Sequence, residues 1–206
     1  MTRPLGIILA GGLATRMGGG DKGRLPLGDG TLLSHVIDRL APQVDGMALN
    51  ANGDPARFAD TGLPVLPDSI DGYAGPLAGV LAGLDWAAEQ GATHVVSAAA
   101  DTPFFPRDLV DRLLIAAQRD GTDIALAATL DPQRGAMRQP TFGLWPVVLR
   151  DDLRAALNDG LRKVVLWTDK HSAATASFSP TPFDPFFNVN TPDDLAQAEQ
   201  LLETAS

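Results

Sequence analysis

Residues 5–23 read LGIILAGGLATRMGGGDKG, and this stretch decides the fold. The apolar run at residues 5–10 predicts a buried strand. Glycines, together with Arg16 and Lys22, follow it. Glycine lets backbone N–H groups approach a ligand closely, and exposed amides beside two cations form a binding site for anions. A strand that leads into such a loop predicts a site for the phosphates of a nucleotide.

Two other phosphate-binding loops fit this stretch poorly. The Walker loop requires Gly-Lys followed by Ser or Thr, whereas Lys22 lies between Asp21 and Gly23. The dinucleotide pattern G-x-G-x-x-G should begin where the strand ends, but here it begins at Gly18, eight residues beyond Ala10. A flexible glycine loop without a ligand is a further reading that these residues leave open.

The composition limits the classes of protein to which the chain can belong. Its 206 residues, 45% of them hydrophobic, suit one domain with a sizeable core. A net charge of −9 argues against general binding of nucleic acid, which needs a broad basic face. The chain has no cysteine and no run near the ~20 apolar residues that a membrane span requires. We therefore expect a cytoplasmic protein without a nucleic-acid or membrane partner.

Strand and helix patterns alternate along the chain. The predicted strands are Gly6–Ala10, Gly46–Ala51, Pro64–Leu66, His94–Ala98, Ile124–Ala128, Pro140–Trp145 and Ala174–Phe178. The predicted helices are Leu32–Leu40, Pro76–Gln90, Pro106–Arg119, Pro146–Asn158, Leu161–Thr168 and Thr191–Glu203. The alternation predicts a single Rossmann-like α/β domain over residues 1–206, with a mainly parallel, mixed sheet flanked by helices on both faces. In such folds the ligand lies at the carboxyl ends of the strands.

A carboxylate follows one of these strands. The predicted strand His94–Ala98 leads to Asp101, and Pro103 then turns the chain. Mg²⁺ prefers oxygen ligands and is usually held by one or two carboxylates together with substrate phosphates. Asp101 fits that role, and the alternative is a capping role at a turn or at the next helix.

Two asparagines precede the last predicted helix, in the sequence Asn188-Val-Asn190-Thr-Pro. In an extended segment they project to one side, just before a helix N-terminus that favours anions. An amide oxygen can bind Mg²⁺ or a water on it, so Asn190 is a candidate helper ligand. Alternatively, both asparagines serve only turn and capping geometry.

Further polar residues end two other predicted strands. Asn50 ends the second strand and Asp68 follows the third, at the same edge as the glycine-rich loop. A carboxylate can accept the adjacent N1–H and N2–H₂ donors of guanine, which cytosine and uracil lack, so Asp68 favours guanine unless it serves only a surface turn. Gly75, Gly79 and Gly83 are four residues apart, which permits close approach of either a substrate or the sheet.

Together these motifs resemble the molybdenum cofactor guanylyltransferase (MobA) family of nucleotidyltransferases. The resemblance rests on residues 9–22, Asn50, Asp68, residues 75–79, the Asp-Thr-Pro at 101–103 and residues 188–192, and it covers the chain from residue 5 to about residue 200. Ala100 is a mild departure, because the family often carries Cys there. Members of the family transfer GMP from GTP to molybdopterin cofactor with Mg²⁺ and release pyrophosphate.

The resemblance implies roles for individual residues. The residues with implied GTP contacts are Leu9, Ala10, Gly11, Gly12, Lys22, Asn50, Asp68 and Asp101. Arg16, Lys22 and Asp101 become catalytic candidates, and Asp101 with Asn190 become candidate ligands of Mg²⁺. The expected substrates are GTP and molybdopterin cofactor, and the expected protein partners are cofactor-insertion proteins or molybdoenzyme chaperones. A cytidylyltransferase that uses CTP with the same cofactor and a non-catalytic nucleotide sensor are the alternatives.

Overall fold

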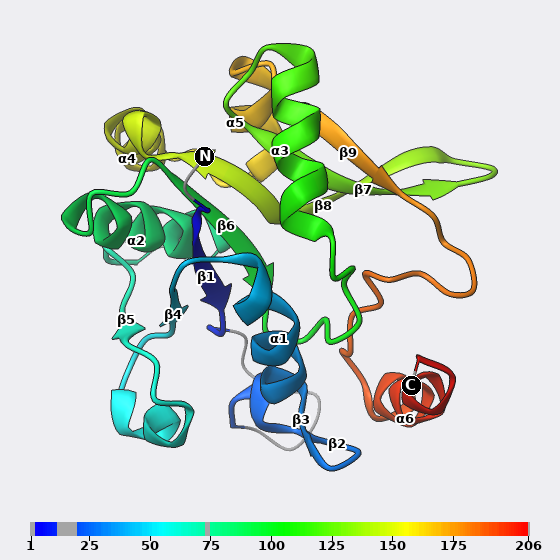
Figure 1. The fold of residues 1–206 in the computed structure, drawn as a ribbon. Helices are drawn as coiled ribbons and strands as arrows, with labels where there is room; N and C mark the ends of the chain where they lie inside the picture. Colours follow the sequence, from blue (N-terminus) through cyan, green and yellow to red (C-terminus); the bar gives the residue numbers. More distant parts are fainter. Residues whose placement is uncertain (1–2, 12–19, 73–74, 206) are drawn as a thin grey trace.

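The computed structural model describes residues 3–11, 20–72 and 75–205. Within these residues, seven strands form one sheet in the order β5-β4-β1-β6-β8-β7-β9 (Figure 1). The strands are β1 (Leu5–Leu9), β4 (Met47–Asn50), β5 (Val65–Leu66), β6 (His94–Ala99), β7 (Ala125–Asp131), β8 (Gly135–Pro146) and β9 (Ala174–Phe178). β8 runs antiparallel to its neighbours β6 and β7, and the other adjacent pairs are parallel. The predicted α/β class with a mainly parallel, mixed sheet is confirmed.

Helices cover both faces of the sheet (Figure 1). The α-helices are α1 (Leu32–Leu40), α2 (Pro76–Glu89), α3 (Leu109–Asp120), α4 (Arg150–Asn158), α5 (Val164–Lys170) and α6 (Pro192–Ala205). The shorter elements are the 3₁₀ helices η2 (Lys22–Arg24), η3 (Ala41–Gln43), η4 (Pro55–Thr61) and η5 (Val147–Leu149), and the hairpin of β2 (Pro26–Leu27) and β3 (Gly30–Thr31). No helix in the described ranges is long and apolar enough to cross a membrane.

Successive side chains of the central strands point alternately into two hydrophobic cores. Adjacent residues of a strand point to opposite faces of the sheet. Ile7 of β1 packs in the core formed with α2, α4 and α5, whereas Ile8 packs in the core formed with α1 and α3. Val95 and Val96 of β6 divide in the same way, and all four side chains are fully buried. Because both faces are covered, these strands are apolar on both sides.

The observed elements correspond to the predicted ones, with differences at their ends. β8 begins at Gly135 and not at Pro140, because its first residues pair with β7 across a hairpin. The helix predicted from Pro146 divides into η5 and α4, because Pro146 still pairs with His94 of β6. α3 begins at Leu109, three residues after its predicted start. The sequence does not predict the β2–β3 hairpin or η4, since neither segment carries a hydrophobic period.

The segment between β9 and α6, residues 179–191, crosses the fold without a helix or strand. Phe186 in this segment is buried and packs edge-on against Phe142 and Phe178. Thr191 Oγ1 accepts a hydrogen bond from Asp194 N, and Asp194 Oδ2 accepts one from Thr191 N. This reciprocal cap fixes the start of α6, with Thr191 as its N-terminal cap.

Candidate active site

A pocket of about 910 Å³ lies at the carboxyl ends of β1, β4 and β6. The parallel ladder continues to this edge, where Ala10 N donates to the Asn50 carbonyl (2.9 Å) and Ala100 N donates to the Leu9 carbonyl (3.1 Å). The lining residues are Leu9, Ala10, Gly11, Lys22, Gly23, Asn50, Asn52, Pro67, Asp68, Ile70, Asp71, Gly72, Gly75, Pro76, Ala99, Ala100, Asp101, Thr141 and Asn188. The topology thus gathers residues that are far apart in the sequence, as expected at this edge of a parallel sheet.

Lys22, Asp101 and Asn190 form a cluster of charged and polar groups beside the pocket. Lys22 Nζ lies 2.7 Å from Asp101 Oδ2 and 2.5 Å from Asn190 Oδ1. The Lys22 and Asp101 side chains are only 14% and 18% exposed, so their ion pair is shielded from water. The Asp101 carbonyl accepts a hydrogen bond from Val189 N (3.0 Å), which holds the Asn190 segment beside β6. The carboxylate of Asp101 and the amide oxygen of Asn190 therefore both contact the same positive charge, the ammonium group of Lys22.

Asn190 is also held from its backbone side, by Asp194. Asp194 Oδ2 accepts hydrogen bonds from the backbone N–H groups of Asn190 and Thr191, each at 2.8 Å. The bond from Asn190 is the largest cause that holds the pKa of Asp194 below its ordinary value, and the charge of Lys22 acts in the same direction. Asp194 therefore stays ionised near neutral pH and keeps the Asn190 backbone in place.

Asp68, Asn50 and Asn52 form a second cluster in the pocket lining. Asp68 Oδ1 accepts a hydrogen bond from Asn50 Nδ2 (2.9 Å), and Asp68 Oδ2 accepts one from Asn52 Nδ2 (2.8 Å). The Asp68 backbone N–H donates in return to Asn52 Oδ1 (2.8 Å). These bonds fix the plane of the carboxylate, and each oxygen keeps a lone pair for a further donor.

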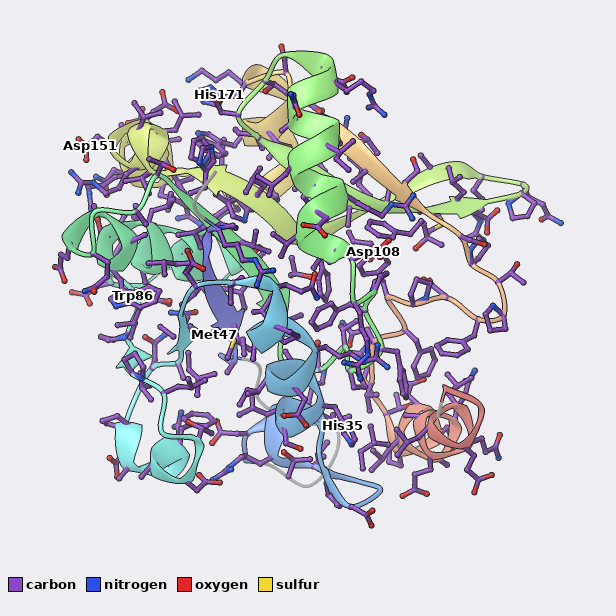
Figure 2. The ribbon with its side chains drawn as sticks, in the orientation of Figure 1. His35, Met47, Trp86, Asp108, Asp151 and His171 are labelled. Carbon is purple, nitrogen blue, oxygen red and sulfur yellow. The ribbon has the colours of Figure 1, made fainter. Side chains whose placement is uncertain are left out.

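The described pocket lining carries more negative than positive charge. Its carboxylates are Asp68, Asp71 and Asp101, and Lys22 is the basic side chain among its described residues. In the described ranges, no group of three or more His, Cys, Asp or Glu side chains is arranged to hold a metal. His35 and His171 lie far apart in the molecule (Figure 2). A metal ion here would therefore depend on Asp101, amide oxygens and the phosphates of a ligand.

Comparison with known proteins identifies the family. The model of the MobA-like NTP transferase domain matches residues 6–173. The molybdenum cofactor guanylyltransferase of Bradyrhizobium sp. (strain ORS 278) is 55% identical over 199 residues, which cover 95% of this chain and 92% of that protein. The chain belongs to the molybdenum cofactor guanylyltransferase family. It is accordingly an enzyme of the nucleotidyltransferase class.

Further relatives agree with this placement. The molybdenum cofactor guanylyltransferase of Mesorhizobium japonicum is 50% identical and covers 97% of this chain and 96% of its own length. The solved structure of molybdopterin-guanine dinucleotide biosynthesis protein A from Archaeoglobus fulgidus has a TM-score of 0.72 at 22% identity, covering 97% and 99% of the two chains. A CMP:2-keto-3-deoxy-manno-octonic acid synthetase bound to CTP has a TM-score of 0.73 at 12% identity over the full length of both chains. At these identities the solved structures support the fold alone.

In this member of the guanylyltransferase family, most of the sequence-predicted site residues line the pocket. These are Leu9, Ala10, Gly11, Lys22, Asn50, Asp68 and Asp101. Asn190 is not in the lining and reaches the site through its contact with Lys22, whereas Asn188 does line the pocket. Gly12 and Arg16 lie outside the described residues.

In this guanylyltransferase-family chain, the sequence patterns assign a nucleotide contact to neither Asn52 nor Thr141. Asn52 lies two residues after Asn50, and in an extended segment that spacing places both amides on one side. Thr141 reaches the pocket from β8, where its carbonyl accepts a hydrogen bond from Ser97 Oγ of β6 (2.9 Å). No local pattern signals Thr141, because its position depends on the antiparallel insertion of β8 beside β6.

Proposed function

We propose that this chain transfers GMP from GTP to the phosphate of molybdopterin cofactor, with Mg²⁺, and releases pyrophosphate. The observation that carries the proposal is that two groups suited to a nucleotide line one pocket. The first is the ammonium group of Lys22, which Asp101 and Asn190 contact. The second is the carboxylate of Asp68, which Asn50 and Asn52 orient. The names of the relatives add the cofactor and the guanine nucleotide. The product would pass to cofactor-insertion proteins or molybdoenzyme chaperones.

The donor groups of the pocket fit a divalent cation. Asp101 Oδ2 and Asn190 Oδ1 are hard oxygen ligands, and both lie within 2.7 Å of the ammonium group of Lys22. The lining is acidic, so a bound triphosphate needs more positive charge than Lys22 supplies. When Lys22 turns from these oxygens to the phosphates, Asp101, with help from Asn190, would hold Mg²⁺ beside them. The bound ion would neutralise charge on the phosphate oxygens and polarise the α-phosphate.

The residues of the chain supply binding and orientation. Asp68 accepts the N1–H and N2–H₂ donors of guanine, and the backbone of residues 9–11 contacts the nucleotide. Lys22, with Arg16, donates to the β- and γ-phosphates. An oxygen of the pterin phosphate bonds to the α-phosphorus, and the bond from that phosphorus to the α–β bridging oxygen breaks, so pyrophosphate leaves with the electron pair. The attacking phosphate is already ionised near neutral pH, so positioning and charge stabilisation are what the protein contributes.

The test is pyrophosphate release with molybdopterin cofactor and Mg²⁺, with GTP and CTP supplied in parallel reactions. We expect release with GTP alone and none after chelation of the metal. Release with CTP alone would replace the guanine nucleotide by cytidine and leave the acceptor in place. Absence of release with both nucleotides, in a preparation that is folded and binds nucleotide, would overturn the proposed acceptor.

A further inference from the structure

We propose that Arg57 is a positioning residue for nucleotide binding, because its guanidinium connects the loop of Lys22 with the residues that hold Asp68. The inference rests on the proposed function. Arg57 lies on η4, does not line the pocket and has no part in the mechanism above. Its guanidinium instead contacts Asp21 on one side and the backbone of Asn52 on the other.

The Arg57 guanidinium contacts three groups: a backbone carbonyl, an aromatic ring and a carboxylate. Nη2 donates to the carbonyl of Asn52 (2.9 Å), and the group lies over the ring of the buried Phe58, 5.2 Å from its centroid. Nε lies 3.0 Å from Asp21 Oδ2. This Nε is buried and makes no aligned hydrogen bond to the described residues, so the carboxylate of Asp21 is what compensates its charge.

These partners belong to the two clusters of the pocket. Asp21 immediately precedes Lys22, and its side chain is only 13% exposed. Asn52 forms two hydrogen bonds with Asp68, one from its side-chain amide and one to its side-chain oxygen. Arg57 thus sets the position of Lys22, the proposed phosphate ligand, relative to Asp68, the proposed guanine ligand. A nucleotide that contacts both residues is bound well only when that spacing is correct.

The local backbone accommodates this guanidinium. Gly53 has φ +88°, a conformation that favours glycine, and a Cβ at this position would lie 3.1 Å from Arg57 Nη1. Lysine could not replace the group, because an ammonium is a single charged point and cannot contact Asp21, Asn52 and the ring in three directions at once. The substitution Arg57→Lys therefore keeps the charge and removes the connection.

The chain offers a matched control between the same two segments. Arg24 of η2 donates to both carboxylate oxygens of Asp60 on η4, at 2.7 and 2.6 Å. This pair is more exposed, with Asp60 at 62%. Arg24 Nη2 also donates to the backbone carbonyl of Arg57 (2.7 Å), a bond that Asp60→Asn retains, and neither Arg24 nor Asp60 contacts Asn52 or Asp68 in the described bonds. Asp60→Asn weakens the attachment of η4 to η2 but leaves the connection to Asp68 intact.

The experiment measures the dissociation constants of GTP and CTP with Mg²⁺ for wild type, Arg57→Lys, Asp21→Asn, the double variant and Asp60→Asn. Thermal unfolding of each protein checks the fold. We expect Arg57→Lys to weaken GTP binding about tenfold and to reduce the preference for GTP over CTP. We expect Asp60→Asn to change the constant less than about twofold, as is usual for an exposed ion pair. The double variant should bind no worse than Arg57→Lys, since the two residues act through one contact.

The outcomes separate this inference from the proposed function. Equal affinities for Arg57→Lys and Asp60→Asn, or a double variant whose losses add, would overturn the positioning role even if the wild type prefers GTP. A wild type that prefers CTP would overturn the proposed nucleotide. The positioning role of Arg57 would then require that Arg57→Lys weakens CTP binding more than Asp60→Asn does. A wild type that binds neither nucleotide would overturn both.

Discussion

Gly79 of α2 lies directly against Asn50 at the end of β4, so that a Cβ on Gly79 would lie 2.2 Å from Asn50 Oδ1. The same Cβ would lie 2.7 Å from Leu9 Cδ2. The absence of a side chain therefore allows the helix to approach the sheet beside the pocket. Since Asn50 holds Asp68, the packing of α2 determines where the carboxylate lies. The spacing of Gly79 and Gly83 reflects close packing on the sheet, one of the two readings that the sequence allows.

We expect Gly79→Ala to weaken GTP binding, because the added methyl group displaces Asn50 and releases one hydrogen bond to Asp68. Overpacking should also reduce the free energy of unfolding by about 1–3 kcal/mol, partly offset by the better helix propensity of alanine. Nucleotide titration and urea unfolding measure the two effects.

Gly83→Ala is the matched control, one turn along the same helix. Its Cβ would lie 3.0 Å from the Cβ of Ile7, which is buried on β1. We expect a loss of stability with little change in nucleotide affinity. If both alanine variants reduce affinity equally, general disturbance of α2 and not the position of Asn50 is responsible.

Asp101→Asn tests the proposed metal ligand. The substitution keeps the shape of the side chain and removes its charge, so the contact with Lys22 and any bond to a cation weaken. We expect pyrophosphate release to fall by about two orders of magnitude or more, a typical loss for a group that stabilises developing charge. The thermal midpoint should also fall, because the shielded ammonium group of Lys22 loses the carboxylate that compensates its charge. The rates are therefore compared at a temperature at which both proteins are folded. Wild-type rates in the variant would exclude Asp101 as a ligand needed for turnover.

Much of the fold follows from short patterns in the sequence. The alternation that sends Ile7 and Ile8 to opposite cores is visible in the first strand, and the parallel class then brings the ends of β1, β4 and β6 to one edge. That rule alone predicts that Leu9, Asn50 and Asp101 lie near one another, as the structure places them. The roles of these residues stay predictions.

The orientation of the site residues does not follow from sequence patterns. Asp68 faces the pocket because Asn50 and Asn52 hold both of its oxygens, and Arg57 reaches Asn52 from a 3₁₀ helix without a hydrophobic period. Asn190 approaches Lys22 through a loop whose path depends on the packing of Phe186. Such contacts join segments that are distant in the sequence, so no local pattern encodes them.

The stability of the protein should depend on the charge of Asp152 in acid. Burial tends to raise the pKa of Asp152, but hydrogen bonds from Trp167 Nε1 and His171 Nε2, both 2.8 Å, together with the charges of His171 and Lys170, hold it below its ordinary value. A lowered pKa of a carboxyl group stabilises the folded state above the unfolded pKa, about 3.9, and this stabilisation is lost as the pH falls through the folded pKa.

Urea unfolding of wild type and Asp152→Asn at pH 7, 5 and 3 checks this expectation. The wild type should be more stable than the variant at pH 7 and 5. The difference should shrink at pH 3, which lies below the unfolded pKa, because the unfolded chain then binds a proton at residue 152 more readily than the folded protein does. A difference that stays constant over this range would show that the shape of residue 152, and not its charge, connects α4 with α5.

Ser69→Ala tests how firmly the segment after β5 must be held. Ser69 Oγ donates to Asp85 Oδ2 of α2 (2.6 Å), and Asp85 accepts further hydrogen bonds from Arg154 of α4 (2.6 and 2.8 Å). Ser69 follows Asp68 directly, so its bond to Asp85 holds the backbone next to Asp68, the residue proposed to bind guanine. Its loss should reduce the free energy of unfolding by about 1 kcal/mol and raise the KM for GTP several-fold with little change in kcat. Ser69→Thr, which keeps the hydroxyl, should restore the KM. A fall in kcat at unchanged KM would instead place the effect of Ser69 in the chemical step and contradict an anchoring role.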